Sequence, residues 1–208
     1  MLGQPFVCKL HLYFYKPTNS CLFFMDISEL IRKAKRGSAA AQECLFTRLA
    51  DKMLLLCRRY VKSPEDAEEI LLTGFYKFFK NLPAFNYQGE PALYAWLKKM
   101  MVNECLMFLR KKNVFIIVTE SVAEEIVLAE EALDNLSADE ILKLVMQLPV
   151  GYRTVFNLYV IEGMDHKEIA AMMGISEGTS KSQLSKARSL LQKMLSKKGI
   201  EYVKRKAQ

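Results

Sequence analysis

The 208-residue chain contains no pair of cysteines at CxxC spacing and only two histidines, His11 and His166. Neither histidine lies near any of the five cysteines in sequence, whereas zinc sites group their Cys and His ligands at short spacings. Cys44, Cys57 and Cys105 fall among apolar residues of helical runs, where cysteine usually behaves as a small core hydrophobe. We therefore predict no metal, no cofactor and no disulfide scaffold, and a reducing, cytoplasmic setting.

Long apolar runs are also lacking. The opening 25 residues are the most apolar stretch, but Lys9, Lys16 and Pro17 interrupt them. No run approaches the ~20 residues that a membrane-spanning helix requires. The stretch has neither the charged start nor the small-residue cleavage site of an export signal, so we predict no direct membrane insertion. Two interpretations stay open for residues 1–24: an N-terminal tail, or translation from an upstream start site, since a clean amphipathic pattern follows Met25.

Strand-like alternation is absent except in VFIIV at 114–118, which we assign to a linker or a short helix start. From Ile27 the apolar residues recur with helical periodicity almost throughout. Ser38 and Ser63 are plausible N-caps, and Pro91 is placed to begin a further helix. The sequence therefore predicts an all-α fold.

The charges fall into blocks that suggest two domains. Residues 26–112 carry 16 Lys and Arg against 10 Asp and Glu, whereas residues 113–142 carry 8 acids and no Lys or Arg. From residue 143 onward, 12 basic residues again exceed 5 acidic ones. We predict two small helical domains, 26–112 and 141–197, joined by an acidic linker at 113–140 and followed by a basic tail at 198–208. Basic blocks of this size favour a polyanion such as nucleic acid, with solvated helix faces as the alternative.

The C-terminal segment HKEIAAMMGISEGTSKSQLSKARSLLQKM has the pattern of a helix-turn-helix. Asp165 and Glu168 have capping-box spacing, Gly174 stands where the first helix should stop, and Ser176 can cap the second. On the second helix, one stripe is apolar and the opposite face is small and polar with basic borders. The predicted core stripe is Leu184, Ala187, Leu191 and Met194; the predicted DNA-facing side is Ser182, Ser185 and Ser189, bordered by Lys181, Lys186 and Arg188. An ordinary solvated face is the alternative.

The helix predicted from Pro91 is apolar nearly all round, apart from one stripe. Lys99, Asn103 and Arg110 lie within about 40° of one another on a helical projection, and Lys111 follows. A basic stripe with a central amide suits contact with a nucleic-acid strand. The preceding loop supplies Phe85 and Tyr87 as rings on which an unstacked base could rest. The alternative is that both rings belong to the core and the cations merely complement the helix dipole.

Four aromatic residues, Phe75, Tyr76, Phe78 and Phe79, follow the acidic start of the helix predicted after Ser63. They cannot all face one core. We expect some of them to contact a partner protein, with packing against the other helices as the alternative.

Taken together, the chain resembles the bacterial RNA polymerase sigma factors of the small, two-domain extracytoplasmic-function (ECF) type over about residues 26–197. DAEEILLTGFYKFF is similar to the polymerase-binding helix, and YQGEPALYAWLKKMMVNECLMFLRKK to the promoter-melting and minus-ten segment. LPVGYRTVFNLYVIEGMDHKEIAAMMGISEGTSKSQLSKARSLL is similar to the minus-thirty-five module, and the acidic spacer stands where the family has its linker. The ordered set of segments is more specific than any single one.

The resemblance implies roles for individual residues. It assigns core-polymerase binding to Asp66, Glu68 and Glu69; the minus-ten strand and its flipped base to Phe85, Asn86, Tyr87, Lys99, Asn103, Arg110 and Lys111; and the minus-thirty-five groove to Lys181, Ser182, Ser185 and Lys186, with Arg188 on phosphate. Four residues depart from the family's pattern: Leu72 and Thr73 beside the clamp contact, Met107 in place of a common Asp, and Ser180 at a usually aliphatic core position.

The resemblance implies a non-enzymatic function with core RNA polymerase and promoter DNA as partners. It also implies an anti-sigma factor, which in this family is often membrane-bound. Two rival functions remain. An operator-binding helix-turn-helix regulator would account for the pattern of residues 141–197 but would give residues 26–112 no function. A thiol- or metal-dependent enzyme finds no base, metal spacing or phosphate loop in the sequence.

Overall fold

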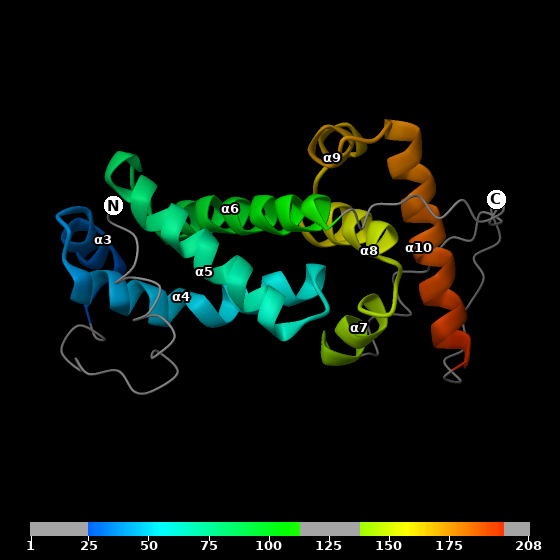
Figure 1. Ribbon diagram of the computed structural model, residues 1–208, viewed down its shortest axis with the longest axis horizontal. Helices are drawn as coiled ribbons and strands as arrows, with labels where there is room; N and C mark the ends of the chain where they lie inside the picture. The colour runs from blue at the N-terminus through cyan, green and yellow to red at the C-terminus, as the bar shows by residue number, and fades with distance from the viewer. Residues whose placement is uncertain (1–24, 113–137, 198–208) are drawn as a thin grey trace. The chain divides into compact units, whose positions relative to one another are not determined.

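The computed structural model describes residues 25–112 and 138–197, and within these ranges every regular element is helical (Figure 1). The prediction of an all-α fold is therefore confirmed. The chain divides into two compact units, Met1–Phe108 and Leu109–Gln208. The segments predicted as an N-terminal tail (1–24), most of the acidic linker and the basic tail (198–208) lie outside the described residues, so the domain boundaries stay predictions. No helix in the described ranges combines the length and the apolar character needed to cross a membrane.

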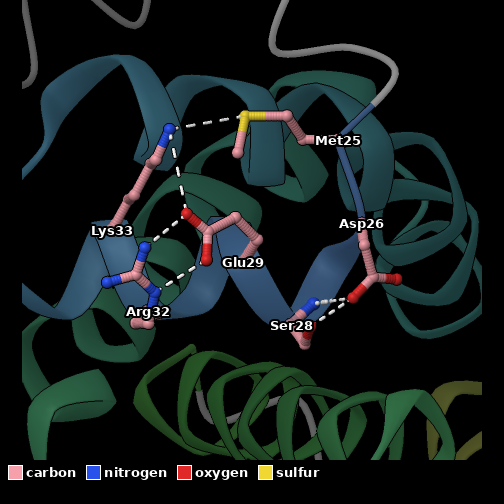
Figure 2. A network of polar contacts seen from close by, with 6 residues as sticks. All are labelled: Met25, Asp26, Ser28, Glu29, Arg32 and Lys33. Carbon is pink, nitrogen blue, oxygen red and sulfur yellow. Dashed lines mark hydrogen bonds and ion pairs between the residues drawn. The ribbon is translucent and has the colours of Figure 1, made fainter.

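The first described helix, α3 (Ile27–Lys35), is held at its start by side chains (Figure 2). The carboxylate of Asp26 accepts a hydrogen bond from the backbone N–H of Ser28 at 3.0 Å, which satisfies one of the free donors at the helix start. One turn on, the Arg32 guanidinium donates to both carboxylate oxygens of Glu29, at 2.7 and 2.5 Å. Residue 26 therefore begins a folded helix, as the amphipathic pattern after Met25 predicts.

Two long helices, α4 (Ala39–Tyr60) and α5 (Pro64–Asn81), follow and pack against each other. Each begins at a predicted cap: the hydroxyl of Ser38 accepts from Ala41 N, and that of Ser63 accepts from Asp66 N at 3.0 Å. The proline at the start of α5 costs no hydrogen bond there, because the first helical N–H groups have no partner within the helix.

The helix α6 (Glu90–Lys111) follows the short 3-10 turn η1 (Leu82–Ala84) and approaches α5 closely at a glycine. A Cβ at Gly74 would lie 2.3 Å from Sδ and 2.7 Å from Cε of Met101, whose side chain is fully buried. A side chain at position 74 would therefore require the end of the Met101 side chain to move. The glycine allows Met101 of α6 to pack directly against the backbone of α5.

The aromatic residues of α5 are divided between the core and the surface. Phe75 and Phe78 are fully buried, Phe79 is half-buried, and Tyr76 is 52% exposed. The buried and half-buried rings form a continuous set of edge and tilted contacts, which comprises Phe46–Phe75, Phe75–Phe78, Phe75–Phe79, Phe78–Phe79 and Phe78–Trp96. Packing among helices therefore explains three of the four aromatic residues, and only Tyr76 remains on the surface.

The second unit has its own set of helices. In chain order they are α7 (Ala138–Val145), α8 (Val150–Phe156), the π-helical turn η3 (Asn157–Ile161), α9 (His166–Met173) and α10 (Glu177–Lys197). The longest of them, α10, contacts α7, α8 and α9. The apolar sides of the shorter helices are therefore covered largely by α10.

A buried arginine connects the first two helices of this unit. The side chain of Arg153 on α8 is 1% exposed, and its Nη1 donates to the carbonyl oxygens of Met146 and Leu148 at 3.2 and 3.3 Å. These carbonyls follow α7 directly, where a helix leaves acceptors unsatisfied. Burial lowers the pKa of Arg153. The guanidinium thus fixes the turn between α7 and α8.

The turn between α9 and α10 has the predicted helix-turn-helix geometry. The Asp165 carboxylate accepts from Glu168 N at 2.7 Å while the Glu168 carboxylate accepts from Asp165 N at 3.0 Å, which completes a capping box. Gly174 ends α9 in the left-handed conformation, with φ 70° and ψ 35°. The Ser176 hydroxyl then accepts from Thr179 N at 3.0 Å and caps α10. All four predictions for this turn are confirmed.

Candidate nucleic-acid interface

One side of α10 is held in the core of its unit. Leu184, Ala187 and Leu191 are buried as predicted, but Met194 is only half-buried. Leu195, one position further on, is fully buried in its place. At the start of the same stripe stands Ser180, which is 0% exposed. The buried stripe fixes which residues of α10 face outward.

The outward side of α10 is open mainly in its first half. Ser182 is exposed and donates its hydroxyl to Thr179 O at 3.0 Å, and Ser185 is half-buried. Ser189, which we predicted on the same open face, is only 4% exposed, so that part of the prediction is wrong. An isolated helical projection does not include the rest of the folded chain, which covers Ser189. The accessible part is the N-terminal half, the part of a recognition helix that enters the major groove.

Two lysines border this face, and each has a partner within the unit. Lys181 Nζ lies 2.7 Å from Oε1 of Glu177, with both side chains more than half exposed. Lys186 Nζ lies 6.0 Å from the centroid of the Tyr152 ring. An exposed ion pair is weak, so the interaction with Glu177 does not prevent Lys181 from reaching a phosphate. Lys186 is half-buried.

Arg188 belongs to a group of four residues that we call the ring network: Tyr159, His166, Ser180 and Arg188. The guanidinium of Arg188 lies over the Tyr159 ring, 5.9 Å from its centroid. The rings of Tyr159 and His166 stack at 4.6 Å with 23° between their planes. His166 Nδ1 lies 2.9 Å from the Ser180 hydroxyl, and which of the two donates depends on the tautomer of the imidazole.

Several charges surround the imidazole of His166. Burial makes the largest contribution and lowers its pKa below 6.5, and the nearby cations of Lys181 and Arg188 lower it further. The carboxylates of Glu177 and Asp165 oppose this shift. His166 is therefore neutral at neutral pH.

The predicted stripe on α6 is exposed. Lys99, Asn103, Arg110 and Lys111 all have exposed side chains, whereas the other side of the helix is buried through Leu93, Leu97, Met101 and Cys105. Met107, one helical turn beyond Asn103, is 53% exposed and lies beside the stripe. Lys99, Asn103 and Arg110 thus lie on one exposed side of α6, and Lys111 is exposed at its C-terminal end.

The loop before α6 places the predicted rings differently. Phe85 is half-buried and stacks face to face on Trp96 of α6, with centroids 4.2 Å apart and 6° between planes, and its carbonyl accepts a hydrogen bond from Lys35 Nζ. Asn86 is exposed and Tyr87 is half-buried. Desolvation raises the pKa of Tyr87, helped by the nearby carboxylates of Asp26 and Glu90. One face of Phe85 is therefore already occupied by the indole.

The three acids predicted to bind polymerase lie near the start of α5. Asp66 and Glu68 are half-buried and Glu69 is exposed, whereas Ala67 and Ile70 between and beyond them are buried. Among the departures from the family's pattern, Leu72 is half-buried and Thr73 exposed. The carboxylates are thus directed away from the core, at the end of the helix where the dipole favours negative charge.

The cysteines lie apart from these surfaces. Cys44, Cys57 and Cys105 are buried and form no disulfide. A hydrogen bond between the Cys105 thiol and Cys57, together with burial, raises the pKa of Cys105 well above its usual value, which disfavours the thiolate needed for nucleophilic attack. Within residues 25–112 and 138–197, no three His, Cys, Asp or Glu side chains are grouped closely enough to hold a metal ion.

Sequence reasoning missed four residues that contact the predicted site residues or Ser180: Trp96, Tyr152, Tyr159 and His166. Trp96 is the only tryptophan of the chain and follows a predicted loop with two rings, which is a usable signal. Ser180 stood out as a polar residue on the core stripe, and that signal points to a buried partner. Nothing in the sequence around Tyr159 indicates its contacts, because they join three separate elements.

The comparisons with known proteins cover both units. Residues 45–114 match the family "Sigma-70 region 2", and residues 138–191 match "Sigma-70, region 4". The RNA polymerase sigma-H factor of Pseudomonas aeruginosa is 26% identical over 180 residues, which cover 80% of this chain and 92% of that protein. The ECF RNA polymerase sigma factor SigW of Bacillus subtilis is 27% identical over 184 residues, 82% of this chain and 97% of SigW. Among solved structures, the sigma factor RpoE in complex with the anti-sigma factor NepR from Bartonella quintana is 24% identical, with a TM-score of 0.45, over 73% of this chain and 94% of that chain.

Proposed function

The chain belongs to the RNA polymerase sigma factors of the ECF type, which direct core polymerase to promoters and assist DNA melting, and we propose that its two units divide these tasks between them. The observation that carries the proposal is the order of the matches. Region 2 falls on the unit with the α6 stripe, and region 4 falls on the unit with the helix-turn-helix. An operator-binding regulator has no use for a region 2 domain, so the region 2 match favours a sigma factor over such a regulator.

The second unit binds the minus-thirty-five element as duplex. The N-terminal half of α10 enters the major groove, with Ser182 and Ser185 near base edges and Lys181 and Lys186 at the flanks. Small polar side chains at the centre allow close approach, and basic side chains at the borders meet phosphates. Arg188 contacts the DNA backbone. The exposure of Lys181 and Ser182 and the partial exposure of Ser185, Lys186 and Arg188 support the assignment.

The helix α6 and the loop before it bind the separated minus-ten strand. Lys99, Arg110 and Lys111 contact the strand's phosphates, and Asn103 offers an amide to a base edge. A flipped base is captured by the loop of Phe85, Asn86 and Tyr87, beside Trp96. Extruding a base costs roughly a few kcal/mol, and stacking on a ring offsets about 1–3 kcal/mol of that. The mechanism is non-enzymatic and acts in the cytoplasm.

Core RNA polymerase is the partner of the acids on α5. Asp66, Glu68 and Glu69 precede the exposed ring of Tyr76 by about two to three turns of the same helix. Tyrosine is enriched at protein interfaces, so the exposed ring supports a protein contact along this helix. An anti-sigma factor is the second protein partner in this proposal, and it keeps the chain from polymerase until it is released.

Transcription reconstituted from purified parts tests the proposal. Full-length protein and core polymerase are incubated with a genomic promoter library, and the starts of the transcripts are mapped. We expect discrete starts that share two upstream elements. The variant Glu68→Lys with Glu69→Lys should lose co-elution with core polymerase, and Glu43→Lys with Asp51→Lys on α4, which also reverses two carboxylates, serves as a charge-matched control. A protein that shows no affinity for core polymerase would contradict the proposed function.

A further inference from the structure

The ring network joins two positions of α10 through two other elements. Ser180 and Arg188 are eight residues apart on α10, about 12 Å along the helix axis. His166, the first residue of α9, contacts Ser180, and Tyr159 of η3 contacts both His166 and Arg188. The four side chains thus form a continuous series of contacts, from Ser180 through His166 and Tyr159 to Arg188, that begins and ends on α10.

The contact at Ser180 fixes the register of α10 against α9. Ser180 is fully buried on a stripe whose other members are apolar, so its hydroxyl requires a partner. His166 Nδ1 supplies that partner at 2.9 Å. A rotation or slide of α10 would leave a buried hydroxyl unsatisfied. The hydrogen bond therefore favours one placement of the helix.

The contact at Tyr159 restricts the side chain of Arg188. A free arginine side chain samples many rotamers and loses that entropy when it grips a phosphate. A guanidinium lying over an aromatic ring is attracted to it, which removes part of that freedom beforehand. The stack on His166 in turn holds the Tyr159 ring in place. A side chain that is ordered before binding loses less entropy when it contacts a phosphate. Ordering Arg188 in the free protein therefore raises the affinity for DNA without adding a contact.

We propose that His166 and Tyr159 are positioning residues, which with Ser180 hold the guanidinium of Arg188 in place for a DNA phosphate. The inference rests on the proposed function of α10 as the minus-thirty-five helix. His166 and Tyr159 themselves need not touch DNA. They act through Arg188.

The experiment is a double-mutant cycle on holoenzyme made from full-length protein and core polymerase. The probe is a fluorescent duplex selected from a random pool by the parent holoenzyme, and the readout is its dissociation constant. His166→Ala, Tyr159→Leu and Arg188→Ala should each weaken binding by about three- to tenfold, the range expected for ordering one long side chain. In the Arg188→Ala background, His166→Ala and Tyr159→Leu should have no further effect.

Two further variants separate positioning from loss of folding. Ile169→Val lies in the buried part of α9 outside the ring network, and should lower the melting temperature while leaving affinity unchanged. His166→Phe with Ser180→Ala keeps a ring against Tyr159 and removes the buried hydroxyl, and should restore affinity to within about twofold of the parent.

The possible outcomes separate a failure of the positioning role from a failure of the proposed sigma-factor function. A protein that forms no transcribing holoenzyme overturns the proposed function and this inference with it. A transcribing holoenzyme in which the effects of His166→Ala and Arg188→Ala multiply, or in which Arg188→Ala has no effect, overturns the inference alone. Loss of affinity in Ile169→Val that matches its loss of stability overturns it as well.

Discussion

Lys77 on α5 and Glu104 on α6 form an ion pair, with Nζ 2.6 Å from Oε1. Glu104 is 9% exposed, whereas the Lys77 side chain keeps 39% of its surface in solvent. Removing the lysine alone would leave a nearly buried carboxylate without this partner, and removing both charges would not. We expect Lys77→Met to destabilise the first unit by about 1–3 kcal/mol.

Urea unfolding followed by Trp96 fluorescence measures this loss in the first unit. The double variant Lys77→Met with Glu104→Leu should recover most of the lost stability, because apolar residues of similar size replace the pair. If the double variant is no more stable than Lys77→Met, the unpaired carboxylate of Glu104 is not the cause of the lost stability.

Phe85 is predicted to act on strand separation rather than on duplex binding. Phe85→Ala removes the ring that stacks on Trp96, and with it a surface for an unstacked base. Stacking of one base is worth about 1–3 kcal/mol, so promoter opening should fall roughly tenfold. Permanganate reactivity of unpaired thymines in holoenzyme complexes measures the opening.

The control for Phe85 is Thr47→Ala, at an exposed residue of α4 far from the loop in sequence. It should open promoters as the parent does. If Phe85→Ala weakens binding to closed duplex as much as it weakens opening, the ring has no special part in base capture.

Glu177 is predicted to oppose DNA binding. It lies at the start of α10, where its carboxylate pairs with Lys181 at 2.7 Å, and hydrogen bonding to that lysine lowers its pKa. It is therefore ionised at neutral pH and repels phosphates near the recognition face. Glu177→Gln should tighten binding by about two- to fivefold at low salt, and the gain should vanish at high salt as both charges are screened.

Fluorescence anisotropy across a salt series measures the effect of Glu177→Gln. Lys181→Ala is the matched comparison: it should weaken binding and make the salt dependence shallower by about one unit of slope. Equal affinities of parent and Glu177→Gln at every salt concentration would place this end of α10 away from the DNA.

The stability of the second unit should depend on pH through His166. Because burial and the cations of Lys181 and Arg188 lower its pKa in the folded state, the unfolded chain takes up the proton first as pH falls. The folded second unit is therefore most stable above pH 6.5 and loses stability progressively as pH falls below that value. The carboxylates of Glu177 and Asp165 reduce this loss, because they raise the pKa of His166.

Thermal unfolding of parent and His166→Gln between about pH 7.5 and pH 5 isolates this dependence, since all other titrating groups are common to both proteins. The parent should lose more stability than the variant over this interval. Parallel curves would indicate that the imidazole titrates alike in folded and unfolded chains.

Features that depend on a few neighbouring residues were predictable from the sequence. The caps at Ser38, Ser63 and Ser176 and the capping box at Asp165 were all correct, because a cap requires only the adjacent backbone. The apolar stripe of α10 was correct for the same reason, except at its C-terminal end.

Features that join distant segments were not predictable. The stack of Phe85 on Trp96 depends on how the loop folds back on α6, and the burial of Ser189 depends on the rest of the folded chain. The ring network draws on positions 159, 166, 180 and 188, which no periodicity links. The roles of the site residues remain predictions, because exposure alone identifies no ligand.

The missing side chain at Gly74 has a mechanical consequence. Because Sδ and Cε of Met101 fill the space where a Cβ would stand, any side chain at position 74 would have to displace the end of the Met101 side chain. The carboxylates that we propose for polymerase binding and the amide that we propose for the minus-ten strand lie on the two helices that meet at this contact. In the proposed function, a change of packing at position 74 would therefore alter the placement of Asn103 relative to the polymerase-bound helix α5.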